Sequence, residues 1–273
     1  MTDHLDAPHQ LLLQMLRDFV EAEVRPKAKA VDEEERFPEE TVRQMARYGL
    51  MGIPFPKEYG GAGGDNLAYT LAVEELSKAC GTTGVILSAH TSLCAAPIYE
   101  HGTEAQKQKY LPGIASGDII TSFALTEPEA GSDSGAVQTR AVRDGDHYVL
   151  NGAKRYITNA NKADLFTVMA RTDPSNPGGG GVSAFLVERN APGLSVGKPE
   201  KKMGQQGAHV CDVIFDNVRV PVENRIGAEG EGFKVAMQVL DKGRLHISAL
   251  CVGVAERLIT DCVAYATERK QFG

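Results

Sequence analysis

The spacing of apolar residues changes twice along the 273-residue chain. Up to about residue 118, apolar residues recur at intervals of three and four, which places them on one face of an α-helix. From Ile119 a strand-like alternation takes over, and from Gly230 the helical spacing returns and continues to Glu268. This order predicts an α+β fold: an N-terminal helical bundle (residues 1–118), a middle antiparallel β-barrel or sandwich (119–227) and the beginning of a C-terminal helical bundle (228–273).

Start and stop signals divide the first 118 residues into separate helices. The predicted helices are residues 10–24, 38–48, 65–79, 85–99 and 103–112, bounded by Pro26, Gly49, the cap Asp65, the Thr103 capping box and Pro112. The segment 49–65 is rich in Gly and Pro and predicts a loop. His90 lies in a stretch that is apolar on most sides, and we interpret it as a buried core histidine in preference to a substrate contact.

Turn signals divide the middle domain into short strands. Asp144-Gly145 and Asn151-Gly152 predict tight turns, and the Pro- and Gly-rich segment 173–181 predicts a mobile surface hairpin loop. The predicted strands are residues 148–150, 155–158, 165–170, 182–187 and 210–215. No GxGxxG motif follows a strand, which excludes a Rossmann nucleotide site as the main interpretation.

Composition excludes several classes of protein. The net charge of −7 and the lack of a basic cluster interleaved with aromatic residues argue against a general nucleic-acid surface. The five cysteines are odd in number and include no CxxC pair, which predicts buried or partly buried free thiols in a reducing compartment and no metal site. The sequence shows no signal peptide and no apolar stretch of about 20 residues, so we expect a cytoplasmic protein without a membrane span.

The segment Leu125–Ala136 leaves an apolar run and enters a loop rich in Gly, Ser and acidic residues. Thr126, Ser132 and Ser134 supply hydroxyls, and Gly131 frees backbone N–H groups. This mixture suits a site that holds a polar cofactor by hydrogen bonds. Taken alone, such a loop is more often an ordinary surface turn.

Four motifs favour the cofactor site over the turn. The segments Leu125–Ala136, Lys154–Asn159, Leu240–Arg244 and Arg269–Gly273 resemble, in order and approximate spacing, the motifs of the acyl-CoA dehydrogenase flavoprotein family. The resemblance runs from the first predicted helix to the last residue. Within the stretch 85–99, the run Leu87–Cys94 is most similar to short-chain, butyryl-CoA-type members.

The resemblance implies an enzyme of fatty acid β-oxidation that binds FAD. Members of the family introduce an α,β double bond into an acyl-CoA thioester and pass electrons to electron-transfer flavoprotein, and the resemblance implies a homotetramer. The residues that it assigns to FAD are Phe123, Leu125, Thr126, Gly131, Ser132, Tyr156, Ile157 and Thr158, with Arg269 directed to the FAD of a neighbouring subunit. Those that it assigns to the substrate are Ser132, Asp241, Lys242, Gly243 and Arg244.

The catalytic glutamate of the family has no match in this chain. A minority of members carry it at the position of Gly243, and glycine cannot remove a proton, whereas most carry it in a domain beyond Gly273. We therefore expect the sequence to be a fragment without the base, and we assign Glu127 and Glu129 to the cofactor loop. Two alternatives stay open: an acyl-CoA oxidase-like enzyme, and a non-catalytic subunit that binds flavin or acyl-CoA.

Overall fold

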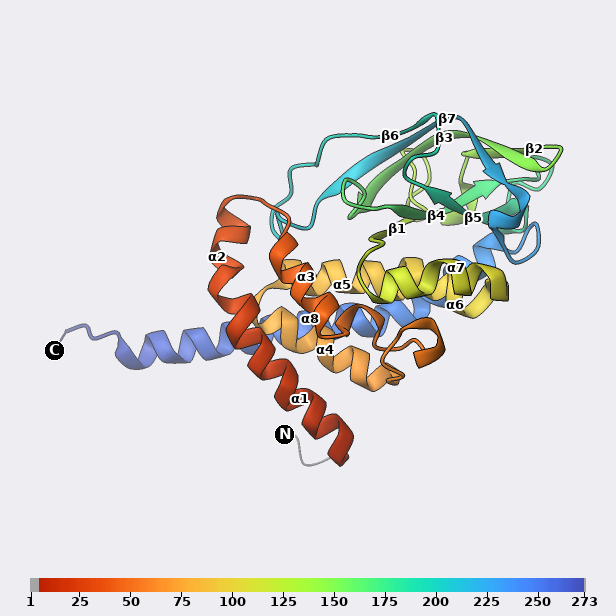
Figure 1. Cartoon of the computed structure of the whole chain (residues 1–273). Helices are drawn as coiled ribbons and strands as arrows, with labels where there is room; N and C mark the ends of the chain where they lie inside the picture. The colour runs from red at the N-terminus through yellow and green to blue at the C-terminus, as the bar shows by residue number, and fades with distance from the viewer. Residues whose placement is uncertain (1–4, 273) are drawn as a thin grey trace.

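The computed structural model describes residues 5–272 and consists of a layer of helices packed against an eight-stranded β-sheet (Figure 1). Gly273, the end of the fourth motif, lies outside the described residues. The helices are α1 (Ala7–Phe19), the π-helical turn η1 (Val20–Val24), α2 (Arg25–Glu33), α3 (Glu39–Arg47), α4 (Asn66–Ala79), α5 (Gly81–Ser88), the π-helical segment η4 (Ala89–Ala95), α6 (Ala96–His101), α7 (Glu104–Ala115) and α8 (Gly232–Glu268). The predicted α+β fold is confirmed.

Several predicted helix boundaries are confirmed by capping contacts. The Asp65 carboxylate accepts a hydrogen bond from the Ala68 N–H at 2.8 Å, which caps α4. Thr103 and Gln106 form both hydrogen bonds of a capping box at the start of α7. Gly49 adopts φ +72° directly after α3, a left-handed conformation that glycine adopts without strain.

Other helix boundaries differ from the prediction. Pro26 was expected to perturb or end the first helix, and it perturbs the helix without ending it. The π-helical turn η1 precedes Pro26, and the chain continues into α2, where Pro26 lies in the first turn and its missing N–H is not needed. Helix α7 continues past Pro112 to Ala115, since Leu111 and Ile114 are fully buried and their packing outweighs the lost hydrogen bond. The predicted helix 85–99 begins earlier, at Gly81, and contains the π-helical segment η4.

The sheet is mainly antiparallel but includes parallel pairs. Its strands are β1 (Thr121–Ala124), β2 (Arg140–Asp144), β3 (His147–Thr158), β4 (Leu165–Arg171), β5 (Val182–Glu188), β6 (Leu194–Val196), β7 (Val210–Pro221) and β8 (Arg225–Ile226). The order is β6-β7-β3-β2-β4-β5-β8, and β1 adds to β4 in parallel with Thr121 opposite Leu165. Strand β2 also meets β4 in parallel, at Arg140 and Arg171.

One predicted turn is wrong. Asn151-Gly152 lies inside the continuous strand β3, where the register with β7 shifts between Leu150 and Gly152. A Cβ at Gly152 would lie 2.5 Å from the hydroxyl oxygen of Thr139, so this glycine permits the close approach of the residue that precedes β2. Asp144-Gly145 forms the predicted turn between β2 and β3, and Gly145 has φ +63°.

Helix α8 connects the two layers. At its start Gly232 packs against the backbone of Ser183 and Ala184 in β5, and further along Gly253 packs against the backbone of Glu74 in α4. Beyond Gly253 the helix extends away from the body (Figure 1), and its apolar side chains there are exposed: Leu258, Ile259, Val263 and Tyr265. Among the described residues, no helix has the length and apolar character needed to cross a membrane.

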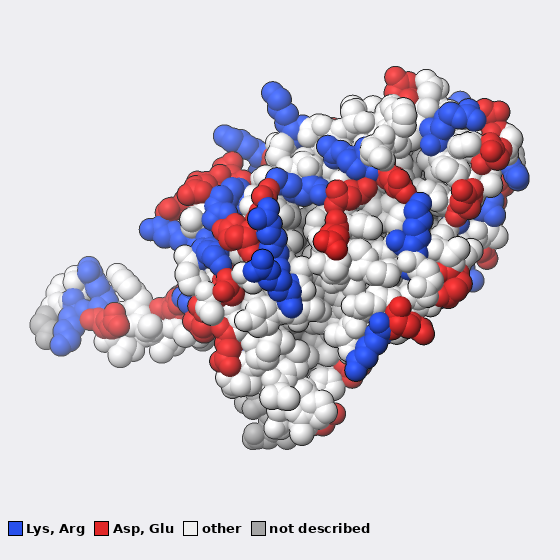
Figure 2. Space-filling model, viewed as in Figure 1, with Lys and Arg blue, Asp and Glu red and all other residues white. Residues whose placement is uncertain are grey.

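Charged side chains of both signs lie next to one another on the face shown in Figure 2.

The body of the molecule is held by three apolar clusters: one among α1–α5, one between the helices and the sheet, and one within the sheet. The second cluster joins Tyr110 and Ile114 of α7 to Leu165 and Met169 of β4. It therefore fixes the helical layer against the sheet, beside the end of β1.

Candidate active site

A cavity of about 320 Å³ opens where η4, the end of β1, the end of β3 and α8 meet. Its volume lies at the lower end of the range of small-molecule sites. The lining residues are Leu93, Phe123, Leu125, Thr126, Gly131, Ser134, Tyr156, Ile157, Thr158 and Leu240. Seven of these ten are residues that the sequence assigned to a cofactor, although they come from segments separated by about 30 residues.

The cavity offers free hydrogen-bond donors between apolar walls. The backbone N–H of Thr126 has no hydrogen-bond partner in the part of the chain that the structure describes. The Thr126 and Thr158 side chains line the cavity, and the Ser122 hydroxyl holds the Thr158 backbone by donating to its carbonyl. A Cβ at Gly131 would meet nothing within 4 Å, so the loop leaves open space there. This donor set fits a planar, polar ring system.

Tyr156 has an unusual backbone conformation within β3. The register of β3 against β7 shifts between Lys154 and Ile157, and Tyr156 adopts φ +59°, a conformation that is uncommon for a residue with a large side chain. The ring is 56% exposed, and the guanidinium of Arg155 lies 4.8 Å from its centroid. Tyr156 is therefore presented at the cavity as an exposed aromatic surface, and not buried as a strand aromatic.

A buried ion pair lies behind the cavity loop. Nζ of Lys154 lies 2.7 Å from Oε1 of Glu127, and both side chains are almost completely buried. Burial alone would raise the pKa of the Glu127 carboxyl, but the Lys154 charge and hydrogen bonds from Lys154, Thr139 and Gln138 outweigh it and lower the pKa. Glu127 is thus an ionised structural carboxylate, while Glu129 is exposed on the loop.

The predicted substrate residues do not all face the first cavity. Asp241 and Arg244 are exposed and lie 3.4 Å apart, and Gly243 is buried where an added Cβ would lie 3.0 Å from Leu93. Lys242 points to another face of α8 and forms an ion pair with Glu100 at 2.7 Å.

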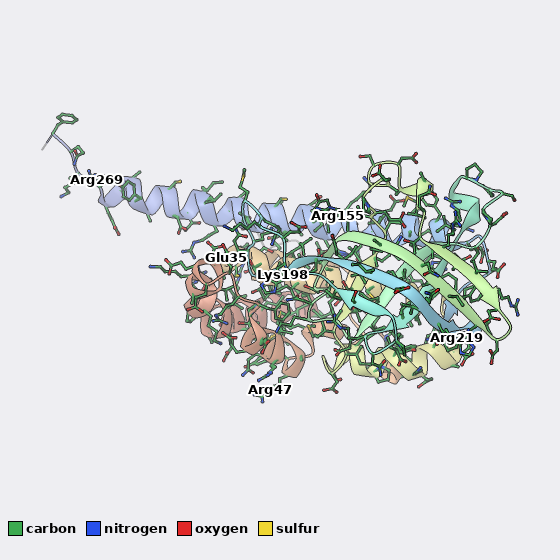
Figure 3. All side chains as sticks on the ribbon, turned by 90° about the horizontal axis from the view of Figure 1, so that it is seen from above. Glu35, Arg47, Arg155, Lys198, Arg219 and Arg269 are labelled. Carbon is green, nitrogen blue, oxygen red and sulfur yellow. The ribbon has the colours of Figure 1, made fainter. Side chains whose placement is uncertain are left out.

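Two predicted cofactor residues also lie outside the cavity lining. Ser132 is exposed on the loop between Gly131 and Ser134. Arg269 is exposed at the end of α8, and Figure 3 shows it at the far end of the helix from Arg155. Neither residue contacts the cavity within this chain.

A second cavity of about 380 Å³ lies between α4, η4, α6 and α8, and it shares no lining residue with the first. Lys242 and His246 line it from α8, and Asn66 and Tyr69 line it from α4. Nε2 of His246 lies 2.9 Å from Oδ1 of Asn66, and burial lowers the pKa of His246 to about 4. This histidine is therefore neutral near pH 7.

His90 is the buried core histidine that the sequence predicted. It is fully buried, with Nε2 3.1 Å from the Ile114 carbonyl and Nδ1 3.2 Å from the Thr121 backbone nitrogen. Burial lowers its pKa to about 4, so it links η4, α7 and β1 as a neutral ring. It does not line either cavity.

Sequence reasoning missed Leu93 and Leu240 as cavity residues and missed the role of Lys154, whereas Ser134 was among the hydroxyls expected at the site. Leu240 and Ser134 belong to recognised motifs, so their positions carried a signal. Leu93 comes from η4, and its approach to Gly243 of α8 is a contact between segments 150 residues apart in the chain. Such long-range packing leaves no local pattern in the sequence.

The geometry defines a cavity with polar groups between a helical layer and a β-sheet, and comparisons with known proteins identify the class. Residues 6–118 match the family model of the acyl-CoA dehydrogenase N-terminal domain, residues 122–218 that of the middle domain and residues 230–273 that of the C-terminal domain. The chain therefore belongs to the acyl-CoA dehydrogenase family, whose members are oxidoreductases.

Individual relatives are similar over the whole chain. All 273 residues align at 56% identity with the short-chain specific acyl-CoA dehydrogenase of Clostridium acetobutylicum and cover 72% of it. The structure of butyryl-CoA dehydrogenase from Megasphaera elsdenii matches with a TM-score of 0.96 and 42% identity, over all of this chain and 72% of that one. A structure described as the electron transferring flavoprotein of Acidaminococcus fermentans matches with a TM-score of 0.97 and 47% identity, with the same coverage.

Proposed function

We propose that the protein is an FAD-dependent dehydrogenase that introduces an α,β double bond into a short-chain acyl-CoA thioester. The observation that carries this proposal is the first cavity, because Thr126, Thr158 and Leu240, from three separate motifs, meet there. Its free donors suit the polar edge of an isoalloxazine, and its apolar walls suit the ring faces. FAD supplies a hydride acceptor for the β-carbon of the substrate when it is bound.

The residues that would hold the flavin ring are those that line the cavity. Thr126 and Thr158 would donate hydrogen bonds to its polar edge, and Tyr156 would cover part of the ring. The remaining contacts would come from Phe123, Leu125, Gly131 and Ile157. We assign Arg269 to the FAD of a neighbouring subunit, because it lies far from the cavity of its own chain.

The substrate would enter along the exposed face of α8. Asp241 and Arg244 are free to contact a CoA thioester there, with Ser132 of the loop on the CoA arm. Gly243 lets α8 pack closely against Leu93, which lines the cavity. Lys242 is held by Glu100 on another face, so we assign it no direct contact with the substrate.

Removal of the α-proton needs a base that the cavity does not provide. None of the ten residues that line it carries a carboxylate. Glu127 is committed to Lys154 and to two backbone N–H groups, so it cannot reach a substrate. We therefore expect the base from another part of the full-length protein, as in the majority of the family.

The short-chain assignment is supported by the named relatives, a short-chain specific acyl-CoA dehydrogenase and a butyryl-CoA dehydrogenase. We take electron-transfer flavoprotein as the electron acceptor, and a role in β-oxidation follows from the reaction. A homotetramer would cover the exposed apolar side chains at the end of α8, such as Leu258 and Val263. The thiols of Cys80, Cys94 and Cys211 are free and buried, as expected, whereas Cys251 and Cys262 are exposed, contrary to the expectation; free thiols suit a cytoplasmic location.

Anaerobic stopped-flow mixing of the full-length protein with butyryl-CoA tests the proposal. We expect the flavin absorbance to bleach, and electron-transfer flavoprotein to restore it faster than air does. Rapid restoration by air would favour an oxidase-like enzyme. A protein that binds FAD but is not reduced by any acyl-CoA would favour the non-catalytic subunit, for which the lack of a carboxylate in the cavity speaks.

A further inference from the structure

The ion pair of Lys154 and Glu127 joins separate backbone segments behind the first cavity. Nζ of Lys154 donates to Oε1 of Glu127 at 2.7 Å and to the Leu125 carbonyl at 3.0 Å. Glu127 accepts hydrogen bonds from the backbone N–H groups of Gln138 and Thr139 at 2.5 and 2.9 Å. Strand β3 and both ends of the loop between β1 and β2 are therefore linked through two charged side chains.

Residues of β3 hold the two carbonyl groups on either side of the Thr126 Cα in place. The Leu125 carbonyl accepts from the Lys154 ammonium, and the Thr126 carbonyl accepts from the Arg155 N–H at 2.8 Å. The Thr126 N–H belongs to the same peptide group as the Leu125 carbonyl, and it finds no partner among the described residues. Leu125 and Thr126, which share this peptide group, both line the cavity, and a buried cation orients and polarises the peptide.

We propose that Lys154 is a positioning residue that sets the donor strength of the Thr126 N–H toward the bound cofactor, with Glu127 as the opposing charge. This inference rests on the proposed function, because the cofactor concerned is FAD. A charge-assisted hydrogen bond to a carbonyl polarises the peptide and strengthens its N–H as a donor. Reduction adds electron density to a flavin ring, so the ammonium favours reduced FAD and the carboxylate opposes it.

An electrostatic role and a purely structural role of the pair predict different changes in the affinity for oxidised and reduced FAD. If the pair only held the loop, loss of either charge would weaken the binding of oxidised and reduced FAD alike. An electrostatic role predicts opposite changes, because removal of the cation disfavours reduced FAD and removal of the carboxylate favours it. The test therefore compares variants that keep side-chain volume: Lys154→Met, Glu127→Gln and the double variant.

The measurement is the flavin midpoint potential of the full-length protein together with its affinity for oxidised FAD. In Lys154→Met we expect the affinity for reduced FAD, relative to oxidised FAD, to fall about tenfold, which lowers the potential of a two-electron couple by ~30 mV. Burial lowers the pKa of Lys154 to about 8, and the Glu127 carboxylate opposes this effect, so Glu127→Gln must be measured at a mildly acidic pH that keeps Lys154 protonated. Under that condition we expect a change of similar size in the other direction. The double variant should lie near the wild-type value.

A matched control is Glu39→Gln, which removes the carboxylate of the surface pair with Lys162 and should leave the potential unchanged. Equal shifts of the same sign in both single variants, or unchanged potentials, would overturn the proposal. If Lys154→Met does not fold, Glu127→Gln at the same mildly acidic pH decides, since an electrostatic role raises its potential and a purely structural role leaves it unchanged. Failure of the wild-type protein to bind FAD would instead refute the proposed function.

Discussion

The two ends of the loop between β1 and β2 are held by two buried cations in different ways. At the start of the loop, Lys154 pairs with the Glu127 carboxylate. At the other end Arg171, which is 7% exposed, forms no ion pair within the described residues. Its guanidinium donates instead to five backbone carbonyls, those of Gly135, Val137, Asn176, Pro177 and Gly178.

This difference separates two uses of a buried cation. Arg171 satisfies the carbonyls of two irregular segments and so fixes the loop 173–181 against the end of the loop between β1 and β2. Its charge is offset by many peptide dipoles, so no single partner controls it. Lys154 is offset mainly by one ionisable group, and its charge acts on the peptide that faces the cavity. Only the Lys154 end should couple loop structure to cofactor electrostatics.

The largest effect is expected at Lys154. Lys154→Met leaves the Glu127 carboxylate buried without its partner, and breaking a buried pair in this way costs roughly 3–5 kcal/mol of unfolding free energy. The double variant Lys154→Met/Glu127→Gln removes both charges and should recover most of the loss. Urea unfolding of the FAD-free proteins measures these values, and a double variant as unstable as the single one would contradict the account of this pair.

A smaller loss is expected at Arg171. Arg171→Met removes hydrogen bonds from a charged donor and should cost roughly 1.5–3 kcal/mol, because water can reach the exposed carbonyls of the loop 173–181. Hydrogen exchange should accelerate in this loop, while the flavin potential stays unchanged. Arg171→Lys is the control, since it keeps the charge but not the fork of donors. If that variant were as stable as the wild-type protein, the five carbonyl contacts would contribute nothing to the free energy of unfolding.

Acid should destabilise the end of the β1–β2 loop that Lys154 and Glu127 hold before it destabilises the end that Arg171 holds. The pKa of the Glu127 carboxyl is lowered from 4.5, since Lys154 and the hydrogen bonds outweigh the effect of burial. As the pH falls below 4.5 the unfolded chain takes up a proton before the folded chain does. The stability from this carboxylate is therefore lost, at up to ~1.4 kcal/mol per pH unit, until the folded carboxyl is also protonated.

Hydrogen exchange at single amides, corrected for the intrinsic exchange rates at each pH, measures this loss of stability. The Thr139 N–H, which donates to Glu127, should lose protection on acidification before the Thr172 N–H, which donates to Gly181. Glu127→Gln should abolish the difference in pH dependence. Equal loss at both amides in the wild-type protein would argue against separate behaviour of the two ends.

The smallest effect is expected for an exposed pair. Arg25 donates two hydrogen bonds of 2.6 Å to the Glu21 carboxylate, on the outer surface of the N-terminal helices. Pairs of this kind contribute about 0.5 kcal/mol or less, because water and salt screen the charges. Glu21→Gln should therefore shift the urea midpoint only slightly. A loss as large as that of Lys154→Met would remove the distinction between buried and exposed pairs.

Local signals predicted much of the fold and of the cavity. The Asp65 cap, the Thr103 capping box and Gly49 mark helix ends by contacts within a few residues, so the sequence reveals them directly. The cavity residues around Thr126 and Thr158 were found because they lie in family motifs. Composition and periodicity alone would have left the loop at Thr126 as a surface turn.

The features that the sequence did not predict depend on contacts between distant segments. Lys154 and Arg171 look like outward-facing strand residues, because nothing local shows that each donates to carbonyls of the loop Leu125–Thr139. Gly152 looks like part of a turn, but the close approach of Thr139 requires it inside β3. Parallel pairing of β1 with β4 likewise joins segments about 40 residues apart and leaves no alternation that differs from an antiparallel strand.

The central claim is that the cavity between Thr126 and Thr158 holds the isoalloxazine of FAD. An equilibrium titration of the FAD-free full-length protein with FAD, followed by flavin absorbance and fluorescence, tests it most directly. We predict saturable binding with the perturbed spectrum of an enclosed flavin, and at least tenfold weaker binding in Thr158→Ala. A wild-type protein that leaves the spectrum of added FAD unchanged would contradict the account.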